Sequence, residues 1–414
     1  MEESKKAGIE AIQLIAVSED NLKFVNPRPD VYCARMPIAG NAWINTGDGV
    51  VLIDTLLSKK AAAKVLEKIH HECGAIKVLI YTHGHLDHCG AAIVYMKDNP
   101  EVIASSYLPN RLDNYKMLAT HRGRIAAQQF NIPEVVGTRE DWVYPTRTFL
   151  GEMTFKLGNK TFELHTARAE TDDVCWVWIP EIKTACIGDL LIRSFPNVGN
   201  PWKPTRFALD WAKTLEQIRD KKPETILYGG ANADLHGEEA ITALTHFIDA
   251  IRSLHDQVVD YINQDVHITE MIHLVKLPEH LQQSPYLNMA YSRIEFFVFN
   301  VYRWYHGYFD HNPANLLPRP EKELKTEIFK LIGDPDKVID RAKELSAKDQ
   351  AQLGLQVLDV LLQADPDNIP ARQLRIELLE KLSANDYCLM SRNSWVYFIE
   401  RDKGFLKSKG VTVK

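Results

Sequence analysis

The chain has 414 residues, 45% of them hydrophobic and 25% charged, and its formal net charge is −6. This length predicts two or three domains, and the mildly negative charge gives no electrostatic reason to expect a nucleic-acid partner. We find neither a secretory signal nor an apolar run of about 18 residues, so no membrane span is expected. The six cysteines are widely spaced and form no CxxC motif. They predict a reducing, cytoplasmic location rather than a disulfide framework.

The first hundred residues alternate between strand and helix patterns. Two or three short strands are predicted within residues 31–55, followed by a helix over residues 58–73 with Ser58 as a candidate N-cap. The apolar run 76–81 predicts a further strand, and another follows at residues 101–106. This order of elements favours layered α/β packing.

A dense group of polar side chains follows the strand at residues 76–81. The stretch Thr82-His83-Gly84-His85-Leu86-Asp87-His88 holds three histidines and an aspartate within six residues, and a helix is predicted to begin near Gly90. Imidazole nitrogens and carboxylate oxygens are the usual ligands of zinc and similar ions. A polar loop with solvent-facing histidines is the alternative. Four ligand-type side chains at the end of a buried strand favour a metal site.

Asp54 also ends a predicted strand, so it is either a carboxylate that orients the nearby histidines or a turn residue. Residues 107–131 have a polar helical pattern that includes Arg111 and Arg122. Those charges fit either substrate contacts or a solvated helix face.

Two acidic residues stand out in the next part of the chain. Strands are predicted at residues 153–157 and 161–166, and Glu170 follows this pair, beside Asp172 and Asp173. Glu170 could therefore be a surface carboxylate. Asp189 follows a buried apolar run and a Gly, which favours a positioned side chain.

Residues 193–206 are rich in Pro, Gly and Asn and are suited to line a cleft. Arg193, Lys203 and Arg206 are candidate contacts for an anionic substrate, since guanidinium groups match sulfate and carboxylate. Each of them, taken singly, also fits an ordinary surface charge.

The spacing H-x-H-x-D-H resembles the signature of the metallo-β-lactamase superfamily. The resemblance implies that His83 and His85 serve one metal and that Asp87 and His88 serve a second. It places Glu170 at the position of a third ligand, usually His. The predicted metal ligands are His83, His85, Asp87, His88, Glu170 and the bridging Asp189.

Glutamate at the third-ligand position resembles the alkylsulfatase branch of the superfamily, in which acidic residues occupy both the third-ligand and the bridging positions. The family's final histidine is absent after the strand near residue 228: Ala231 or Asn232 stands there, and His236 comes about four residues later. Three interpretations stay open. His236 reaches the site by another loop path, Asn232 or a water takes the position, or the second metal is weakly held.

After Gly237 the pattern becomes helical. A long amphipathic helix is predicted over residues 239–263, with further helices at 336–346, 348–364 and 371–383. Residues 284–318 are rich in aromatic side chains, which could be buried in a core or in an interface. This stretch includes Gly307-Tyr308-Phe309-Asp310-His311-Asn312-Pro313-Ala314-Asn315-Leu316, which resembles a motif of the alkylsulfatase dimerisation domain. A homodimer through this helical region is therefore expected.

The predicted fold is an αββα metallo-β-lactamase sandwich followed by an all-α, helical-repeat-like domain. The expected divisions are residues 1–255 for the metal hydrolase domain, 256–385 for the dimerisation domain and 386–414 for a C-terminal tail. Only about thirty residues follow Ser383, too few for the sterol-carrier-like domain that alkylsulfatases of this branch also carry.

The predicted function is a zinc-dependent hydrolase with two Zn²⁺ per chain. A bound water with its pKa lowered toward about 7 would supply hydroxide, and Asp87 and Asp189 are the predicted catalytic carboxylates. The expected substrate is a small sulfate ester, with attack at carbon or at sulfur left open. A lactone, β-lactam or other acyl ester is the alternative substrate. A helical interaction protein with a vestigial metal site is the third hypothesis.

Overall fold

The computed structural model describes residues 21–132, 141–192, 194–229 and 234–412. Two of the predicted site residues, Arg193 and Asn232, lie outside these ranges. The described chain forms two compact units: unit 1 runs to Arg122 and from residue 141 to Tyr305, and unit 2 holds residues 123–132 and 306–412. The predicted boundary after residue 255 remains a prediction; the unit that carries the sheets continues to Tyr305.

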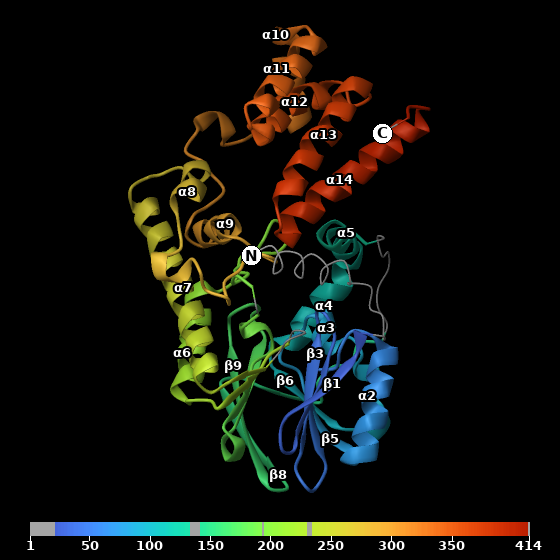
Figure 1. Cartoon of the computed structure of the whole chain (residues 1–414), viewed down its shortest axis with the longest axis vertical. Helices are drawn as coiled ribbons and strands as arrows, with labels where there is room; N and C mark the ends of the chain where they lie inside the picture. The colour runs from blue at the N-terminus through green and yellow to red at the C-terminus, as the bar shows by residue number, and fades with distance from the viewer. Residues whose placement is uncertain (1–20, 133–140, 193, 230–233, 413–414) are drawn as a thin grey trace. The chain divides into compact units, whose positions relative to one another are not determined.

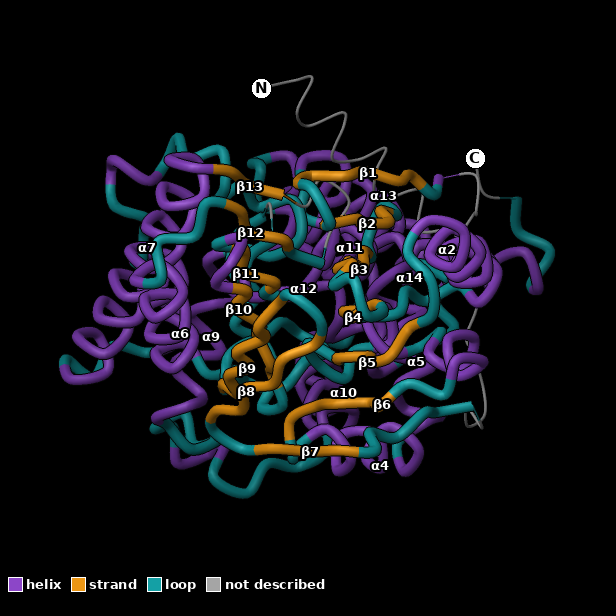
Figure 2. The backbone as a smooth tube through the Cα atoms, turned by 90° about the horizontal axis from the view of Figure 1, so that it is seen from below, coloured by secondary structure: helices purple, strands orange, loops and turns teal. Residues whose placement is uncertain are grey.

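Unit 1 is built on two mixed β-sheets that face each other, as Figure 2 shows from below. The first sheet has seven strands in chain order, antiparallel from β1 to β4 and parallel from β4 to β7. Its strands are β1 (Lys23–Arg28), β2 (Val31–Arg35), β3 (Gly40–Asn45), β4 (Val50–Ile53), β5 (Ile76–Ile80), β6 (Glu101–Ser105) and β7 (Arg147–Phe149).

The second sheet has six strands in the order β13-β12-β11-β10-β9-β8, with β11 and β12 parallel and the other pairs antiparallel. These strands are β8 (Glu152–Leu157), β9 (Lys160–Ala167), β10 (Val174–Ile179), β11 (Thr184–Cys186), β12 (Thr225–Leu227) and β13 (Asp234–His236). Side chains from both sheets, such as Ile44, Ile80, Phe162 and Val177, form one buried cluster between them. This inner layer joins the two sheets into a sandwich.

Helices cover the outer face of each sheet (Figure 1). On the first sheet, Ser58 caps α2 by accepting a hydrogen bond from the Ala61 backbone N–H, as predicted. Where a helix was predicted to begin near Gly90, the structure has the short α3, which ends at Cys89 and includes Asp87 and His88, and then a separate 3₁₀ helix that begins at Ala92. Among the described residues, the longer helices of unit 1 are α2 (Lys59–Glu72), the 3₁₀ helix Ala92–Asp98, α4 (Leu108–Met117), α5 (Ala119–Phe130, which continues into unit 2), α6 (Ala208–Asp220), α7 (Gly237–Asn263), α8 (Ile268–Leu274) and α9 (Ile294–Tyr305), and the short α3 (Leu86–Cys89) carries two of the predicted ligands.

Several aromatic residues of the stretch near α9 are core residues of unit 1. Tyr286, Phe297 and Tyr302 pack in the same buried cluster as Trp211 of α6 and Phe247 of α7. In contrast, Trp304 is half exposed. Core packing therefore accounts for part of the aromatic density that the sequence shows here.

Unit 2 is helical throughout its described elements. Its helices from α11 to α13 share one apolar core, and α14 packs on α13 through a second cluster. They are α10 (Glu321–Ile332), α11 (Pro335–Ala347), α12 (Ala351–Ala364), α13 (Ile369–Asn385) and α14 (Leu389–Ser408). The segment 386–414, predicted as a tail, thus contains a helix. The predicted fold class, a sandwich followed by an all-helical region, is confirmed.

Within the described residues, no helix combines the length and the apolar character that a membrane crossing requires.

Candidate metal centre

The predicted metal-binding residues come from loops at the carboxyl ends of neighbouring strands. Asp54 follows β4, and the loop that starts at Thr82 follows β5, its parallel neighbour. In the facing sheet, Asp189 follows β11 and Gly229 follows β12, again a parallel pair. Carboxyl ends of parallel strands meet at one edge, so the two sheets deliver these side chains to a common place.

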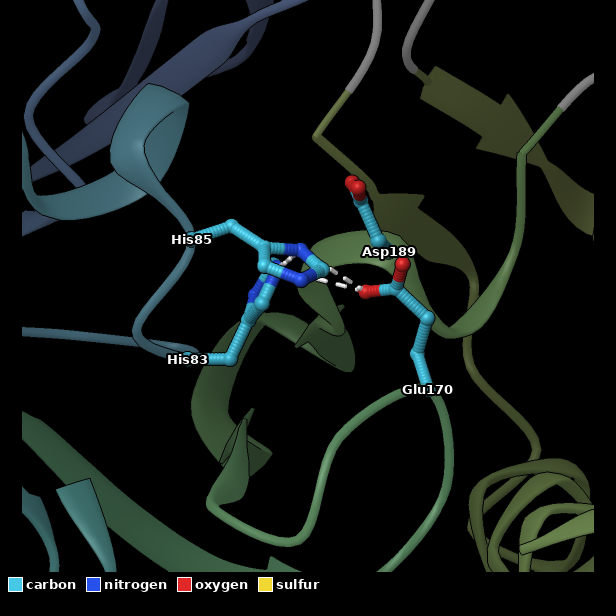
Figure 3. Close-up of side chains that lie close together, drawn as sticks. All are labelled: His83, His85, Glu170 and Asp189. Atoms are coloured by element: carbon cyan, nitrogen blue, oxygen red, sulfur yellow. Dashed lines mark hydrogen bonds and ion pairs between the residues drawn. The ribbon is translucent and has the colours of Figure 1, made fainter. Parts of the chain in front are cut away.

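Three ligand-type atoms of the first group lie in a triangle (Figure 3). His83 Nε2 is 2.8 Å from His85 Nδ1. Glu170 Oε2 is 3.2 Å from His83 Nε2 and 3.4 Å from His85 Nδ1. Metal–ligand bonds of about 2.1 Å give tetrahedral edges of roughly 3.4 Å, close to these separations. Asp189 completes this group of four potential ligands.

A second group shares Asp189 with the first and adds Asp87 and His88. His88 Nε2 lies 3.3 Å from Asp189 Oδ1 and 3.6 Å from Asp87 Oδ2. Both His88 Nε2 and Glu170 Oε2 are buried without a hydrogen-bond partner. A buried polar atom without a partner is costly, and a cation between these atoms would satisfy both of them. The donor sets therefore fit divalent metal ions.

Asp54 orients two of the metal-binding histidines, His88 directly and His83 through Thr82. Its carboxylate accepts hydrogen bonds from the Thr82 backbone N–H at 2.8 Å and the Thr82 hydroxyl at 2.7 Å, and it holds His88 Nδ1 at 2.8 Å. Because the Thr82 hydroxyl donates to Asp54, it accepts from His83 Nδ1–H at 3.1 Å. That tautomer leaves His83 Nε2 with its lone pair directed to the site. Of the two roles considered for Asp54, the structure shows the orienting one.

Burial and neighbouring charges together shift the pKa values of the metal-binding side chains. Desolvation lowers the pKa of His85 to about 3. Burial opposes charge on His88 as well, but Asp189, Asp87 and Asp54 surround it and raise its pKa well above the ordinary value. Burial raises the pKa of Glu170, yet the Arg206 guanidinium and His85 outweigh this and hold that pKa well below its usual range. The site thus concentrates negative charge around the positions that a cation would occupy.

The glutamate predicted as the unusual third ligand is held by a buried arginine. Arg206 Nη1 lies 2.6 Å from Glu170 Oε1, which leaves the other oxygen, Oε2, facing the two histidines. Both side chains are buried. The alternative of Glu170 as a surface residue is therefore wrong.

Asp173 and Arg111 hold the histidine loop, a role that the sequence did not predict for either residue. Asp173 is buried, and its Oδ2 accepts a hydrogen bond from the Gly84 backbone N–H at 2.7 Å. Arg111 of α4 lies with Nε 2.6 Å from Asp173 Oδ1 and pairs with Asp172 as well. In the sequence, the acidic pair Asp172 and Asp173 beside Glu170 was the one feature that could have pointed to this ion-pair cluster.

The candidate anion contacts divide between described and undescribed residues. Lys203 lies within electrostatic reach of Arg206, Arg122, Glu170 and Asp87. Burial, with repulsion from the two arginines, lowers its pKa to about 7. Arg193 lies outside the described residues.

The structure does not bring His236 to the site. In the antiparallel pair of β12 and β13, His236 is opposite Thr225, at the start of β12, whereas Gly229 follows the other end of that strand. Its Nε2 contacts Asp234 at 3.2 Å, and about half of its side chain is exposed. The prediction of His236 as a metal ligand is therefore wrong, because the register of the sheet puts His236 at the edge opposite the metal-binding side chains. Asn232, the other candidate for this position, lies outside the described residues.

Comparisons with known proteins agree with this architecture. Residues 36–230 match the metallo-beta-lactamase superfamily, and residues 267–401 match the alkyl sulfatase dimerisation family. A linear primary-alkylsulfatase of Pseudomonas sp. (strain ATCC 19151) is 24% identical over 82% of this chain and 69% of its own length. An (R)-specific secondary-alkylsulfatase of Pseudomonas sp. is 24% identical over 89% of this chain and 60% of its own.

The fold itself matches a solved structure. The stereoselective inverting sec-alkylsulfatase Pisa1 from Pseudomonas sp. superimposes with a TM-score of 0.84 at 22% identity, over 96% of this chain and 70% of that protein. The chain spans only about three fifths to two thirds of the length of the curated relatives above. With two matched families in one chain and this site geometry, the chain belongs to the metallo-beta-lactamase superfamily, as an alkylsulfatase-like hydrolase that carries an alkyl sulfatase dimerisation domain.

Proposed function

We propose that this protein is a zinc-dependent hydrolase of organic sulfate esters. The observation that carries the proposal is a group of cations beside the metal-binding carboxylates. Among the described residues, neither Arg122 nor Lys203 forms a salt bridge with a carboxylate, and both side chains are partly buried. Partly buried cations that lack a salt-bridge partner favour an anionic ligand.

The residues proposed to hold the first ion are His83, His85, Glu170 and Asp189, and Asp87, His88 and Asp189 would hold the second. A bound zinc ion supplies an acidified water and polarises an oxygen of the substrate. Asp189 is common to both groups and would bridge them. Asp87 is half-buried at the second group: burial would raise its pKa, but His88 outweighs this and holds that pKa low, so it stays ionised.

Lys203, Arg122 and Arg206 would bind the sulfate group of the substrate. Their positive charge would stabilise the negative charge of that group as the ester bond breaks. Arg206 links the two parts of the site, because one guanidinium contacts Glu170 and lies close to Lys203. Tyr291 lies within electrostatic reach of Arg206, Glu170, Asp87 and Asp189, and burial raises the pKa of its hydroxyl well above the ordinary value. A neutral phenol there can donate a hydrogen bond to an anion.

The test is sulfate release from a panel of short and long alkyl sulfates by the zinc-loaded protein. We expect release that a chelator abolishes and added zinc restores. Carboxylic esters and lactones with the same alkyl groups serve as matched controls. Hydrolysis of these controls without any sulfate release would contradict the proposal and favour the acyl-ester alternative. Less than one tightly bound ion per chain, with cleavage of neither class, would favour an interaction protein with a vestigial site.

We also propose that unit 2 mediates a homodimer. The dimerisation family covers residues 267–401, and several large apolar side chains of unit 2 are exposed in that range. Leu324, Ile328 and Leu331 recur at helical spacing along α10, which has no buried residue. An exposed apolar stripe of this kind is typical of a protein interface. The natural occupant is the same stripe of a second copy.

A further inference from the structure

The loop that carries Lys203 and Arg206, here the anion loop (residues 197–206), rests on residues next to and within α9. Just before the loop, the Phe195 backbone N–H donates to the Asn288 carbonyl at 2.7 Å. The Ser194 hydroxyl donates to the same carbonyl at 3.0 Å. The Phe195 ring packs edge-on against Phe297 of α9. The residues that support the anion loop therefore come from a distant part of the chain.

Asn300 provides the polar contact between α9 and the anion loop. It is 2% exposed, and its Nδ2 donates to the Phe296 carbonyl of its own helix at 2.7 Å. That bond fixes the amide so that its oxygen faces the loop, where Thr205 Oγ1 donates to it at 3.3 Å. A buried amide satisfied on both sides specifies one arrangement of its neighbours.

The other arm of the loop meets the same amide. Gly199 has a φ of +127°, and a Cβ built on it would lie only 2.2 Å from Asn300 Oδ1. Only glycine allows the backbone to pass this close. Asn300 therefore contacts both arms of the loop, near its start at Gly199 and near its end at Thr205.

The two arms are also bonded to each other around Arg206. Its backbone N–H donates to the Val198 carbonyl at 3.1 Å, and its guanidinium donates to the Asn197 carbonyl at 2.8 Å. The same guanidinium holds Glu170. A change at Asn300 would thus shift neighbours of Arg206 on both sides, together with Lys203 between them.

We propose that Asn300 is a positioning residue that sets the anion loop in its binding geometry and so places Lys203 and Arg206 for an anionic substrate. This inference rests on the proposed function. It gives α9, which lies within the region matched to the dimerisation family, a role in substrate binding.

The test uses the full-length, zinc-loaded protein with two substitutions that remove the same contact from opposite sides. Asn300→Leu removes the amide, and Thr205→Val removes the hydroxyl with little change in shape. Thr214→Val is the matched control, because the buried Thr214 hydroxyl donates within α6, to the Asp210 carbonyl at 2.8 Å. Binding of inorganic sulfate is measured by calorimetry, and zinc content is measured in parallel.

We expect the dissociation constant for sulfate to rise about tenfold in each variant, with zinc content unchanged and the control like wild type. KM for an alkyl sulfate should rise by a similar factor, while kcat changes less than about threefold. The double variant should lose little more than Asn300→Leu alone, because both changes break one contact.

A second readout does not depend on sulfate binding: the pH dependence of Lys203 acylation, followed by mass spectrometry. A displaced loop exposes the Lys203 amine and moves its labelling midpoint up toward that of ordinary lysines in both variants, but not in the control. A midpoint unchanged in both variants would overturn the role of Asn300, whatever sulfate does. Wild-type protein that fails to bind sulfate would instead overturn the proposed function, and the labelling result would still decide the positioning role. Thr205→Val retains the test if Asn300→Leu does not fold.

Discussion

Replacing Gly229 with alanine adds one methyl group at the point where the end of β12 meets the metal-binding side chains. A Cβ at this position would lie 2.3 Å from Asp189 Oδ1 and 2.5 Å from His88 Cε1, where ordinary contacts begin at 3.4 Å. Something must therefore move by about 1 Å. His88 is held through Asp54 at 2.8 Å, so we expect Asp189 or the strand end to move.

A displacement of this size exceeds the tolerance of about 0.2 Å that metal–ligand bonds allow. Because Asp189 belongs to both ligand groups, Gly229→Ala should release at least one zinc ion per chain. It should lower kcat/KM for an alkyl sulfate at least about 100-fold, equivalent to about 2.7 kcal/mol of transition-state stabilisation. The assays are metal analysis by mass spectrometry and steady-state kinetics.

The matched control is Gly404→Ala in α14, where an added Cβ meets no atom within 4 Å. It should leave metal content and activity unchanged, and it should be neutral or slightly stabilising because alanine favours a helix. A Gly229→Ala protein that kept its full metal content and activity would refute the account of the site.

Three further predictions follow from the same structure. Asp54→Asn should weaken zinc binding about 10- to 100-fold, since it weakens the bond that orients a ligating histidine; competition against a chelating dye measures this, and unchanged affinity would contradict the orienting role. Burial lowers the pKa of Lys203 to about 7, so its charge is present below pH 7 and lost above it. KM for an alkyl sulfate should therefore rise about tenfold between pH 6 and pH 8.5, and a Lys203→Met protein should show a flat profile in this range. Leu324 and Leu331 of the α10 stripe are 49% and 88% exposed; changing both to Glu should convert a dimer to a monomer in light scattering, whereas Leu150→Glu on unit 1 should not.

Local patterns were sufficient to predict much of this molecule. The strand at residues 76–81 and the histidine loop after it depend on neighbouring residues in sequence, and the structure shows both. The Ser58 cap and most helices of unit 2 were predicted for the same reason. Family resemblance extended this to Glu170, whose position in space depends on a facing sheet.

What the sequence could not supply depends on register and on distant packing. His236 has a ligand's chemistry, but the pairing of β13 with β12 places it at the wrong end of the strand. Conversely, the charge of Arg122 fitted either a substrate contact or a solvated helix face, and its place beside Lys203 follows from the fold. The contact between Asn300 and the anion loop joins residues 95 positions apart, and nothing local in either segment predicts it.

Metal content of the purified protein tests the central claim most directly, with wild type compared with His83→Ala and His236→Ala. We predict at least one tightly bound zinc ion in wild type, its loss in His83→Ala, and wild-type content in His236→Ala. Unchanged content in His83→Ala, or loss of the ion in His236→Ala, would contradict the proposed site.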